Sequence, residues 1–355
     1  MSINYIGIMD KLGTKQMILQ GPPGTSKTLT AQYTVAQALG YSGEMDRKKI
    51  SEFLKKHPTR WEMVQFHPSY GYEDFVRGIT VETNKENQIV YKTVNKIFGD
   101  MCNRADEDKD NQFFLIIDEI NRADVATVFG ELIYALEYRE EPIVIPYALD
   151  QEQQENAQKK DSTDQSQTDR TAQENDDKNK SRQLVVPQNL YIIATMNTAD
   201  KSVGNIDYAI RRRFVFFDCP ASEEVLDTYY KTNKSESSSE SVLLFKGVQQ
   251  FLNKNLHGDY RMEDFQIGHT YFMASSEKEA QSASDQKPAY SKQDYKLRYQ
   301  VLPILREYYI DGILRRSGIE HDDTALSQYL SGRQQLDDEA FKAIKKYFSE
   351  NGEKT

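Results

Sequence analysis

A glycine-rich segment directly follows a short apolar run near the start of the chain, and this order restricts the fold more than any other feature. Residues 17–19 read Met-Ile-Leu, and residues 21–28 read Gly-Pro-Pro-Gly-Thr-Ser-Lys-Thr. A strand, a tight loop and a helix that starts at Leu29 would place successive backbone N–H groups around one concavity, beside the positive end of the helix. The segment therefore predicts a phosphate-binding loop within an α/β fold.

The side chains of this loop have distinct chemical roles. Lys27 is expected to reach the β- and γ-phosphates of a nucleoside triphosphate, and the Thr28 hydroxyl to ligate Mg²⁺. Ser26 stands where a second glycine is usual, and its Cβ would cost about 1–2 kcal/mol in a left-handed conformation. Other backbone angles or a hydroxyl–phosphate bond would offset that cost, so we expect retained turnover at an equal or lower rate. The expected nucleotide-binding residues are Gly21, Pro23, Gly24, Thr25, Ser26, Lys27, Thr28 and Leu29.

Two further strand-like runs end in polar side chains. Residues 113–117 are apolar and are followed by Asp118 and Glu119. Because a buried parallel strand delivers such side chains at one edge of a sheet, Asp118 is expected to hold Mg²⁺ through its water shell, and Glu119 to act as general base on the attacking water. Residues 191–196 precede Asn197, which is suited to orient that water or to bind the γ-phosphate.

Three consecutive arginines follow the second of these runs. Arg211, Arg212 and Arg213 cannot all face one way on a helix. At least one can project to the γ-phosphate of a neighbouring subunit and stabilise transition-state charge, a role worth about 10³–10⁵ in rate. The alternative is a basic helix end that interacts with the helix dipole.

The pattern of apolar residues divides the chain into two expected domains. Residues 1–219 alternate strand-like and helical runs, which predicts a nucleotide-binding α/β core, and residues 220–355 are polar and helical, which predicts a second domain. Strands are expected at 16–20, 62–66, 113–118, 190–195 and 215–218, and helices after Thr28, around 93–105, and at 125–140, 301–314 and 337–348.

Three polar segments interrupt this pattern. Residues 150–182 contain no aromatic or branched aliphatic side chain, so the segment cannot bury enough apolar surface to offset its ordering and should be mobile. It lies between the β-prone runs 142–147 and 184–187, and the simplest geometry is a β-hairpin with a long tip. Residues 231–241 and 275–293 are expected to be surface insertions of the second domain.

Composition narrows the classes of partner. The net charge of −10 argues against a broad nucleic-acid-binding surface, although a local basic pore or groove stays open. The two cysteines form no ligand-spaced pair and the five histidines form no short cluster. No signal peptide is visible and no apolar run approaches about 18 residues, so we expect a cytoplasmic protein without membrane association.

These motifs together resemble those of AAA+ ATPases, and their detail is similar to the McrB family, which supplies the motor subunit of McrBC-type modification-dependent restriction systems. The resemblance covers roughly residues 16–315 apart from the polar segments. Met-Asn-Thr-Ala-Asp at 196–200 is its most specific motif. The other segments that carry it are 65–75, 117–123, 207–214 and 264–272.

The resemblance implies a doubly wound parallel five-stranded sheet, a C-terminal helical lid domain and a β-hairpin insertion before the sensor strand. It implies hydrolysis of ATP or GTP with Mg²⁺ by a homo-oligomeric, hexameric ring, an McrC-like nuclease partner, and DNA engaged by the assembled complex. Asp200 would lie near the nucleotide at a subunit interface where Arg212 and Arg213 act, and the hairpin would face the pore. Lys201 stands where the family usually has arginine, so sensing at that interface is expected either to be weaker or to rely on Arg211–Arg213.

Several alternatives stay open. A MoxR-like protein-remodelling ATPase shares the same core, and a nucleotide-locked scaffold would follow if Ser26 blocked hydrolysis. His269 either approaches the nucleotide from the lid or is a structural hydrogen-bonding residue. Because Gly21 lies close to Met1, we expect target recognition to sit on a partner, to be absent, or to lie in a segment removed from this chain. The purine base, the DNA sequence and any modified base are not readable.

Overall fold

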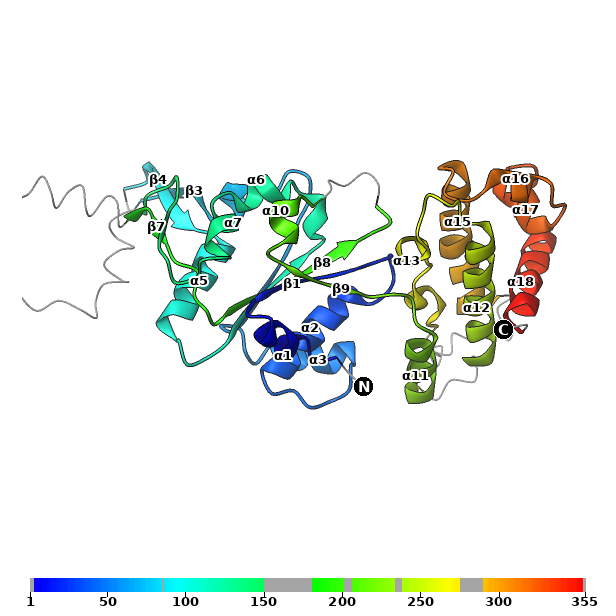
Figure 1. Cartoon of the computed structure of the whole chain (residues 1–355), viewed down its shortest axis with the longest axis horizontal. Helices are drawn as coiled ribbons and strands as arrows, with labels where there is room; N and C mark the ends of the chain where they lie inside the picture. Colours follow the sequence, from blue (N-terminus) through cyan, green and yellow to red (C-terminus); the bar gives the residue numbers. More distant parts are fainter. Residues whose placement is uncertain are drawn as a thin grey trace, which may run out of the picture. The chain divides into compact units, whose positions relative to one another are not determined.

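The computed structural model describes residues 3–84, 86–149, 181–200, 206–233, 238–274 and 290–353. Backbone contacts divide the chain into two compact units (Figure 1). The first unit comprises residues 1–19, 28–196 and 201–217, and the second comprises residues 20–27, 197–200 and 218–355. Residues 20–27, which form most of the predicted phosphate loop, therefore belong to the second unit, together with the helical residues 218–355.

A five-stranded sheet in the order β2-β5-β8-β1-β9 organises the α/β part of the chain. The β2–β5 and β5–β8 pairs are parallel. The three central strands β5, β8 and β1 are buried on both faces, as parallel strands between helical layers are, whereas the edge strands β2 and β9 are only partly buried. The predicted doubly wound parallel sheet is confirmed. Its strands are β1 (Gln16–Gly21), β2 (Trp61–Gln65), β5 (Phe113–Asp118), β8 (Leu190–Asn197) and β9 (Val215–Asp218).

Along each strand, successive side chains point to opposite faces of this sheet. Ile18, Leu115 and Ile192 are fully buried in one cluster with residues of α5, α6, α7 and α10. Figure 1 shows α6, α7 and α10 on one side of the strands and α1, α2 and α3 on the other. The helices are α1 (Tyr5–Lys11), α2 (Lys27–Ala38), α3 (Arg47–Leu54), α4 (Tyr72–Phe75), α5 (Ile97–Glu107), η1 (Ile120–Arg122), α6 (Val125–Phe129), α7 (Leu132–Ala135) and α10 (Tyr208–Arg211).

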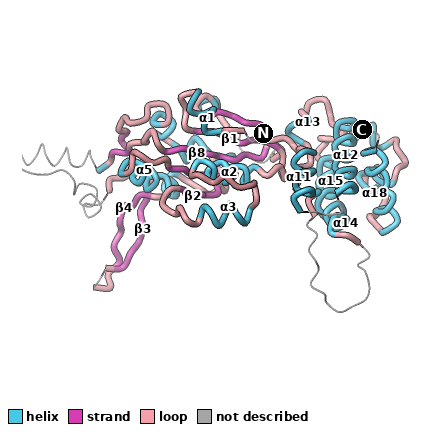
Figure 2. Tube along the Cα trace, turned by 90° about the horizontal axis from the view of Figure 1, so that it is seen from below, coloured by secondary structure: helices cyan, strands magenta, loops and turns pink. Residues whose placement is uncertain are grey.

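A β-hairpin between β2 and α5 was not predicted from the sequence. Strands β3 (Arg77–Thr83) and β4 (Ile89–Asn95) pair antiparallel and extend away from the sheet (Figure 2). The expected helix around 93–105 is wrong at its start, because residues 93–95 pair with residues 77–79 and the helix begins only at Ile97.

The hairpin expected before the third apolar run is present. Strands β6 (Ile143–Val144) and β7 (Gln183–Leu184) pair antiparallel, which confirms the predicted insertion. The backbone N–H of Leu149 donates to the carbonyl of Ser181 at 3.0 Å. This hydrogen bond joins the last described residue before the polar segment to the first described residue after it. The tip expected to be mobile lies outside the described residues, apart from Ser181 and Arg182.

Arg77 joins the bases of the two hairpins. Its side chain is only 1% exposed and donates to Asn95 Oδ1 at 2.7 Å, at the end of β4. The same guanidinium donates to the carbonyls of Tyr147 at 2.9 Å and Ser181 at 2.8 Å, beside β6 and β7. A buried guanidinium needs several acceptors, and here they come from both hairpins, so Arg77 fixes the two bases to each other.

Two helices expected from periodicity are shorter in the structure. The expected helix at 125–140 is divided into α6 and α7 at Gly130, which has a positive φ of 47°. The expected helix at 301–314 is α15 (Leu302–Ile310), which follows a π-helical turn and ends before Gly312 at φ 71°. Glycine adopts these backbone angles without a Cβ clash, and each therefore ends a helix that apolar spacing alone would continue.

From Glu223 onward, the described part of the second unit consists of helices joined by loops, with one isolated β-bridge between Leu256 and Leu314. Helices α12 (Ser238–Asn255) and α18 (Asp338–Glu353) approach closely at Gly247. A Cβ at this position would lie 1.9 Å from the carbonyl oxygen of Phe348, so a larger residue would not fit. Within the described ranges, no helix has the length and apolarity needed to cross a membrane. The remaining helices are α11 (Glu223–Asn233), α13 (Met262–Phe265), η2 (His269–Phe272), α14 (Lys292–Lys296), η3 (Leu297–Val301), α16 (Arg316–Glu320) and α17 (Ala325–Leu330).

The two polar segments of the second unit are described only in part. Residues 231–233 end α11 and residues 238–241 begin α12, so the flanks of the first segment are helical. The second segment, apart from its last four residues, lies outside the described ranges.

Candidate active site

The predicted phosphate loop is closed around the ammonium group of its own lysine. Lys27 is 7% exposed, and its Nζ donates to the carbonyls of Gly21 at 3.0 Å and Pro22 at 2.7 Å. Thr25 Oγ1 donates to the Pro22 carbonyl at 3.0 Å. These bonds shape residues 21–27 into a compact turn with the lysine at its centre, and Thr28 and Leu29 continue it as the first turn of α2.

Ser26 adopts the left-handed backbone conformation considered from the sequence. Its φ is 64°, which a residue with a Cβ rarely adopts and which costs about 1–2 kcal/mol. The serine therefore occupies the conformation for which glycine is normally used, and side-chain contacts must offset the strain.

A segment of the second unit lies directly on this loop. The Gly268 N–H donates to the Pro23 carbonyl at 3.2 Å, and the Thr270 N–H donates to the Gly24 carbonyl at 3.0 Å. Thr270 Oγ1 donates to the same carbonyl at 2.9 Å. A Cβ on Gly268 would lie 2.1 Å from the Gly24 carbonyl carbon, so only glycine permits this approach.

His269, in this same segment, contacts Ser26 and is buried, with 2% of its surface exposed. Burial, and next the positive charge of Lys27, lowers the pKa of His269 to about 4, so the imidazole is neutral at neutral pH. Its Nδ1 accepts the backbone N–H of Ser222 at 3.3 Å, and its Nε2 lies 3.1 Å from Ser26 Oγ. Because Nδ1 accepts, Nε2 carries the proton and donates to Ser26.

The predicted metal ligands lie together in the first unit. Thr28 Oγ1 donates to Asp118 Oδ1 at 2.8 Å. Oxygen ligands of this kind fit Mg²⁺, which takes one or two protein groups and completes its shell with water and substrate phosphates. Elsewhere in the described chain no group of three or more His, Cys, Asp or Glu side chains is placed to hold a metal. Thr28 and Asp118 therefore suit a metal carried in with a nucleotide.

Glu119 directly follows the metal strand in a strained backbone conformation. Its φ is 55° and its ψ 47°, in the left-handed region. The carboxylate is 17% exposed and lies 3.5 Å from Arg122 Nε, one turn along the chain. Non-glycine residues held in this region concentrate at functional sites, where the surrounding structure imposes the strain.

The structure adds Thr195, which the sequence analysis missed. This residue of β8 is 2% exposed, and its Oγ1 donates to Asp118 Oδ1 at 2.6 Å while it accepts the Glu119 N–H at 3.1 Å. One hydroxyl thus fixes both the aspartate side chain and the backbone of the glutamate. Its position in the buried strand, two residues before Asn197, was the only available signal.

Replacing Thr195 with valine is expected to raise the concentration of Mg²⁺ required for half-maximal turnover, because Asp118 loses a donor and the Glu119 N–H loses its acceptor. Loss of these two hydrogen bonds should also lower the free energy of unfolding by about 1–3 kcal/mol. Titration of turnover with Mg²⁺ measures the first effect and urea unfolding the second. Thr195→Ser should restore both, and Thr34→Val, which removes a buried hydroxyl bonded only to the Thr30 carbonyl, is the matched control. An unchanged Mg²⁺ requirement in Thr195→Val contradicts the assignment.

The segment that carries Asn197 and Asp200 contacts the phosphate loop within the second unit. The N–H of Thr198, next to Asn197, donates to the carbonyl of Gly21 at 3.0 Å. Burial, and next the negative charge of Asp200, raises the pKa of the Tyr271 phenol. Thr198 Oγ1 also donates to the Asp264 carbonyl at 3.3 Å, so Thr198 is hydrogen-bonded both to the phosphate loop and to the helical part of the second unit. Lys201 lies outside the described residues.

The three arginines have different surroundings. Arg213 is 8% exposed at its side chain and lies 2.7 Å from Glu137 Oε2. Arg212 lies 3.4 Å from the same oxygen but keeps 65% of its side chain exposed. Arg211 Nε donates to the Ile206 carbonyl at 3.2 Å. Arg211 and Arg212 are therefore both exposed to solvent, whereas the guanidinium of Arg213 is held against Glu137.

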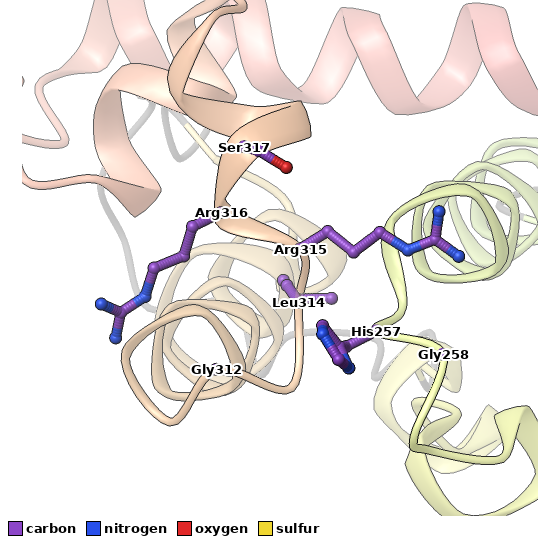
Figure 3. A pocket seen from close by; sticks show the side chains of 7 residues that line it. All are labelled: His257, Gly258, Gly312, Leu314, Arg315, Arg316 and Ser317. Atoms are coloured by element: carbon purple, nitrogen blue, oxygen red, sulfur yellow. The ribbon is translucent and has the colours of Figure 1, made fainter.

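A pocket of about 520 Å³ in the second unit is lined by none of the predicted site residues. Figure 3 shows His257 in its wall and the guanidinium groups of Arg315 and Arg316 pointing to opposite sides. Arg315 donates to the Leu256 carbonyl at 2.8 Å, and Arg316 to the Ile310 carbonyl at 2.6 Å. These arginines hold main-chain carbonyls of neighbouring turns.

Comparison with known proteins places the chain in a family. An AAA domain of the dynein-related subfamily matches residues 16–214, and the McrB alpha-helical lid domain matches residues 247–315. The Type IV methyl-directed restriction enzyme EcoKMcrB subunit of Escherichia coli (strain K12) is 32% identical over 304 residues, which are 84% of this chain and 54% of that protein. The chain thus spans about half the length of this relative.

Two more distant likenesses accompany these matches. The Type II restriction enzyme BsuMI component YdiS of Bacillus subtilis (strain 168) is 24% identical over 291 residues, which are 74% of each protein. The solved structure of C. elegans PCH-2 is 12% identical, with a TM-score of 0.28, over 98% of this chain and 63% of that one. The AAA domain followed by the McrB lid domain shows that the chain belongs to the McrB family of AAA+ proteins.

Proposed function

We propose that the chain is a Mg²⁺-dependent nucleoside triphosphatase that acts as the motor subunit of a restriction system. The observation that carries the proposal is the hydrogen-bonded group of Thr28, Asp118 and Thr195, which adjoins a lysine-centred phosphate loop in the sequence. A nucleotide held by Lys27 would bring its terminal phosphate to Thr28, because the two residues are consecutive. We propose residues 1–219 as the nucleotide-binding core and residues 220–355 as the lid domain.

Each predicted residue then has one role in hydrolysis. The backbone N–H groups of Gly21 and of residues 24–28, together with the Lys27 ammonium, bind the phosphates, and Thr28 with Asp118 would hold Mg²⁺. A metal held there would supply positive charge to neutralise the charge that develops on the phosphate during hydrolysis. Glu119 accepts a proton from the attacking water, which Asn197 orients. Asp200, between the loop and the lid, would report on the nucleotide.

The exposed Arg212 supports an assembly in which subunits share sites. An arginine that is 65% exposed beside one carboxylate partner can leave it to reach a phosphate of the next subunit. We propose a homo-oligomeric ring, hexameric by family resemblance, with Arg212 at the shared interface and Arg213 supporting it. Both curated relatives are named as components of restriction enzymes, so we propose an McrC-like nuclease partner, with DNA bound by the complete assembly in the cytoplasm.

Phosphate release from ATP and from GTP, with Mg²⁺ and at several protein concentrations, tests the proposal. Specific activity should rise with protein concentration if subunits share sites, and should vanish when EDTA removes Mg²⁺ or when Lys27 is replaced by alanine. Stimulation by DNA together with the partner nuclease supports the restriction role. Stimulation by an unfolded polypeptide but not by DNA would favour a MoxR-like remodelling ATPase, which has the same core. No turnover of either nucleotide with the partner present would contradict the enzyme assignment.

A further inference from the structure

We propose that His269 is a positioning residue of the phosphate loop: by holding the Ser26 hydroxyl, it keeps the loop in the left-handed conformation that phosphate binding requires. This inference rests on the proposed nucleotide binding and goes beyond it, because it assigns a specific dependence between one lid residue and one departure from the usual loop sequence. It predicts that the chain needs His269 because it carries serine at position 26.

The first observation is the combination of strain and support at Ser26. The residue has a φ of 64°, and the hydroxyl that its Cβ carries meets His269 Nε2 at 3.1 Å. A glycine at this position would adopt the same backbone angle freely and would have no hydroxyl to hold. The hydrogen bond to His269 therefore stabilises a backbone conformation that is strained for serine, whereas glycine would adopt it without such support.

The second observation is that the imidazole cannot turn away freely. Its Nδ1 accepts the Ser222 N–H at 3.3 Å, which fixes the ring between the loop and the residues before α11. The ring is 2% exposed, so water does not replace either partner readily. Both nitrogen atoms of the neutral ring are thus used, one as acceptor and one as donor.

The third observation is that the segment carrying His269 is anchored on both sides. Gly268 and Thr270 donate to the carbonyls of Pro23 and Gly24, on the loop itself. Lys296 Nζ donates to the carbonyls of Thr270 at 2.8 Å and Met273 at 2.6 Å, which ties the same segment to α14. His269 is therefore presented to Ser26 by a fixed backbone, as a positioning residue must be.

A double-mutant cycle separates positioning from a merely structural role. The variants are Ser26→Gly, His269→Asn, His269→Gln and the double variant Ser26→Gly/His269→Asn. Asparagine retains an acceptor near the Nδ1 position but is too short to reach Ser26, whereas glutamine can place an N–H donor near the Nε2 position. The two measurements are the affinity for fluorescent ATP and GTP analogues, with Mg²⁺, and hydrogen exchange of the amides of residues 21–28 without nucleotide. His321→Asn, at an exposed lid histidine, is the control.

His269→Asn is expected to weaken nucleotide binding about fivefold to tenfold in the natural sequence and less than about twofold when combined with Ser26→Gly. His269→Gln should recover part of the loss. Equal losses in both backgrounds would overturn the proposal, because His269 would then support only the fold of the lid. If the wild-type chain binds neither analogue, the proposed function fails, and exchange decides this inference separately: faster loop exchange in His269→Asn, abolished by Ser26→Gly, supports it, and unchanged exchange overturns it.

Discussion

Glu119→Gln is expected to lower the turnover number about 10²- to 10⁴-fold and to leave nucleotide affinity within about twofold. Glutamine has the size of glutamate but cannot accept the proton of the attacking water at neutral pH, whereas Lys27, Thr28 and Asp118 remain to bind the nucleotide. Single-turnover hydrolysis and equilibrium binding of the same nucleotide measure the two quantities. Subunit assembly with bound nucleotide should also persist, which size-exclusion chromatography would detect.

Glu140→Gln is the matched control for this variant. Glu140 is also a glutamate with a positive φ, 67°, and it accepts the Gln188 N–H at 2.8 Å in an exposed turn. The control therefore makes the same chemical change at a similar backbone conformation outside the proposed site, and its turnover should be unchanged. Loss of nucleotide binding in Glu119→Gln would show that Glu119 binds substrate, and would end its assignment as general base.

Arg212→Ala is expected to lower turnover about 10³-fold or more in the assembled protein, with little change in melting temperature. The guanidinium is largely exposed and its one ion-pair partner, Glu137, keeps Arg213. Arg213→Ala provides the contrast: this arginine is buried against Glu137, so its loss should lower the melting temperature as well as turnover. Thermal unfolding and phosphate release, measured on both variants, give the comparison.

Mixing two inactive variants tests whether the arginine acts between subunits. Lys27→Ala removes phosphate binding but keeps Arg212, and Arg212→Ala keeps the phosphate loop. In a mixed assembly, some interfaces would join an intact loop to an intact arginine, so activity should reappear on mixing. Activity that stays absent in assemblies shown to contain both chains would place Arg212 within its own subunit's site or outside any site.

The centre of the sheet was predictable from the sequence because strands β1, β5 and β8 are buried on both faces. Residues 113–118, for example, form an uninterrupted apolar run that ends in a carboxylate, and the observed strand has the same bounds. The phosphate loop, Asp118 and Glu119 were predicted as site residues for a related reason, since side chains that bind phosphate and metal must follow such strands closely. This part of the prediction therefore rests on the local order of residues in the sequence.

Contacts between distant segments were not predictable in the same way. The strands of the β3–β4 hairpin expose Ile79, Val81 and Tyr91, so their apolar residues do not mark a buried face. Thr195 is one polar residue in an apolar strand, and only the pairing of β5 with β8 brings it to Asp118. The contact between His269 and Ser26 joins residues far apart in the sequence, and neither residue alone indicates the other.

The hydrogen bond between Leu149 and Ser181 makes the β6–β7 hairpin a suitable place to insert a foreign segment. The base of the β6–β7 hairpin is held by the strand pairing, by the Leu149–Ser181 hydrogen bond and by Arg77. We therefore expect this base to tolerate changes in the length of the segment between residues 149 and 181. The entropy of closing a flexible loop grows slowly, by about 0.6 kcal/mol for each doubling of its length. A fluorescent or affinity tag in place of residues 150–180 is therefore expected to leave the base of the hairpin intact.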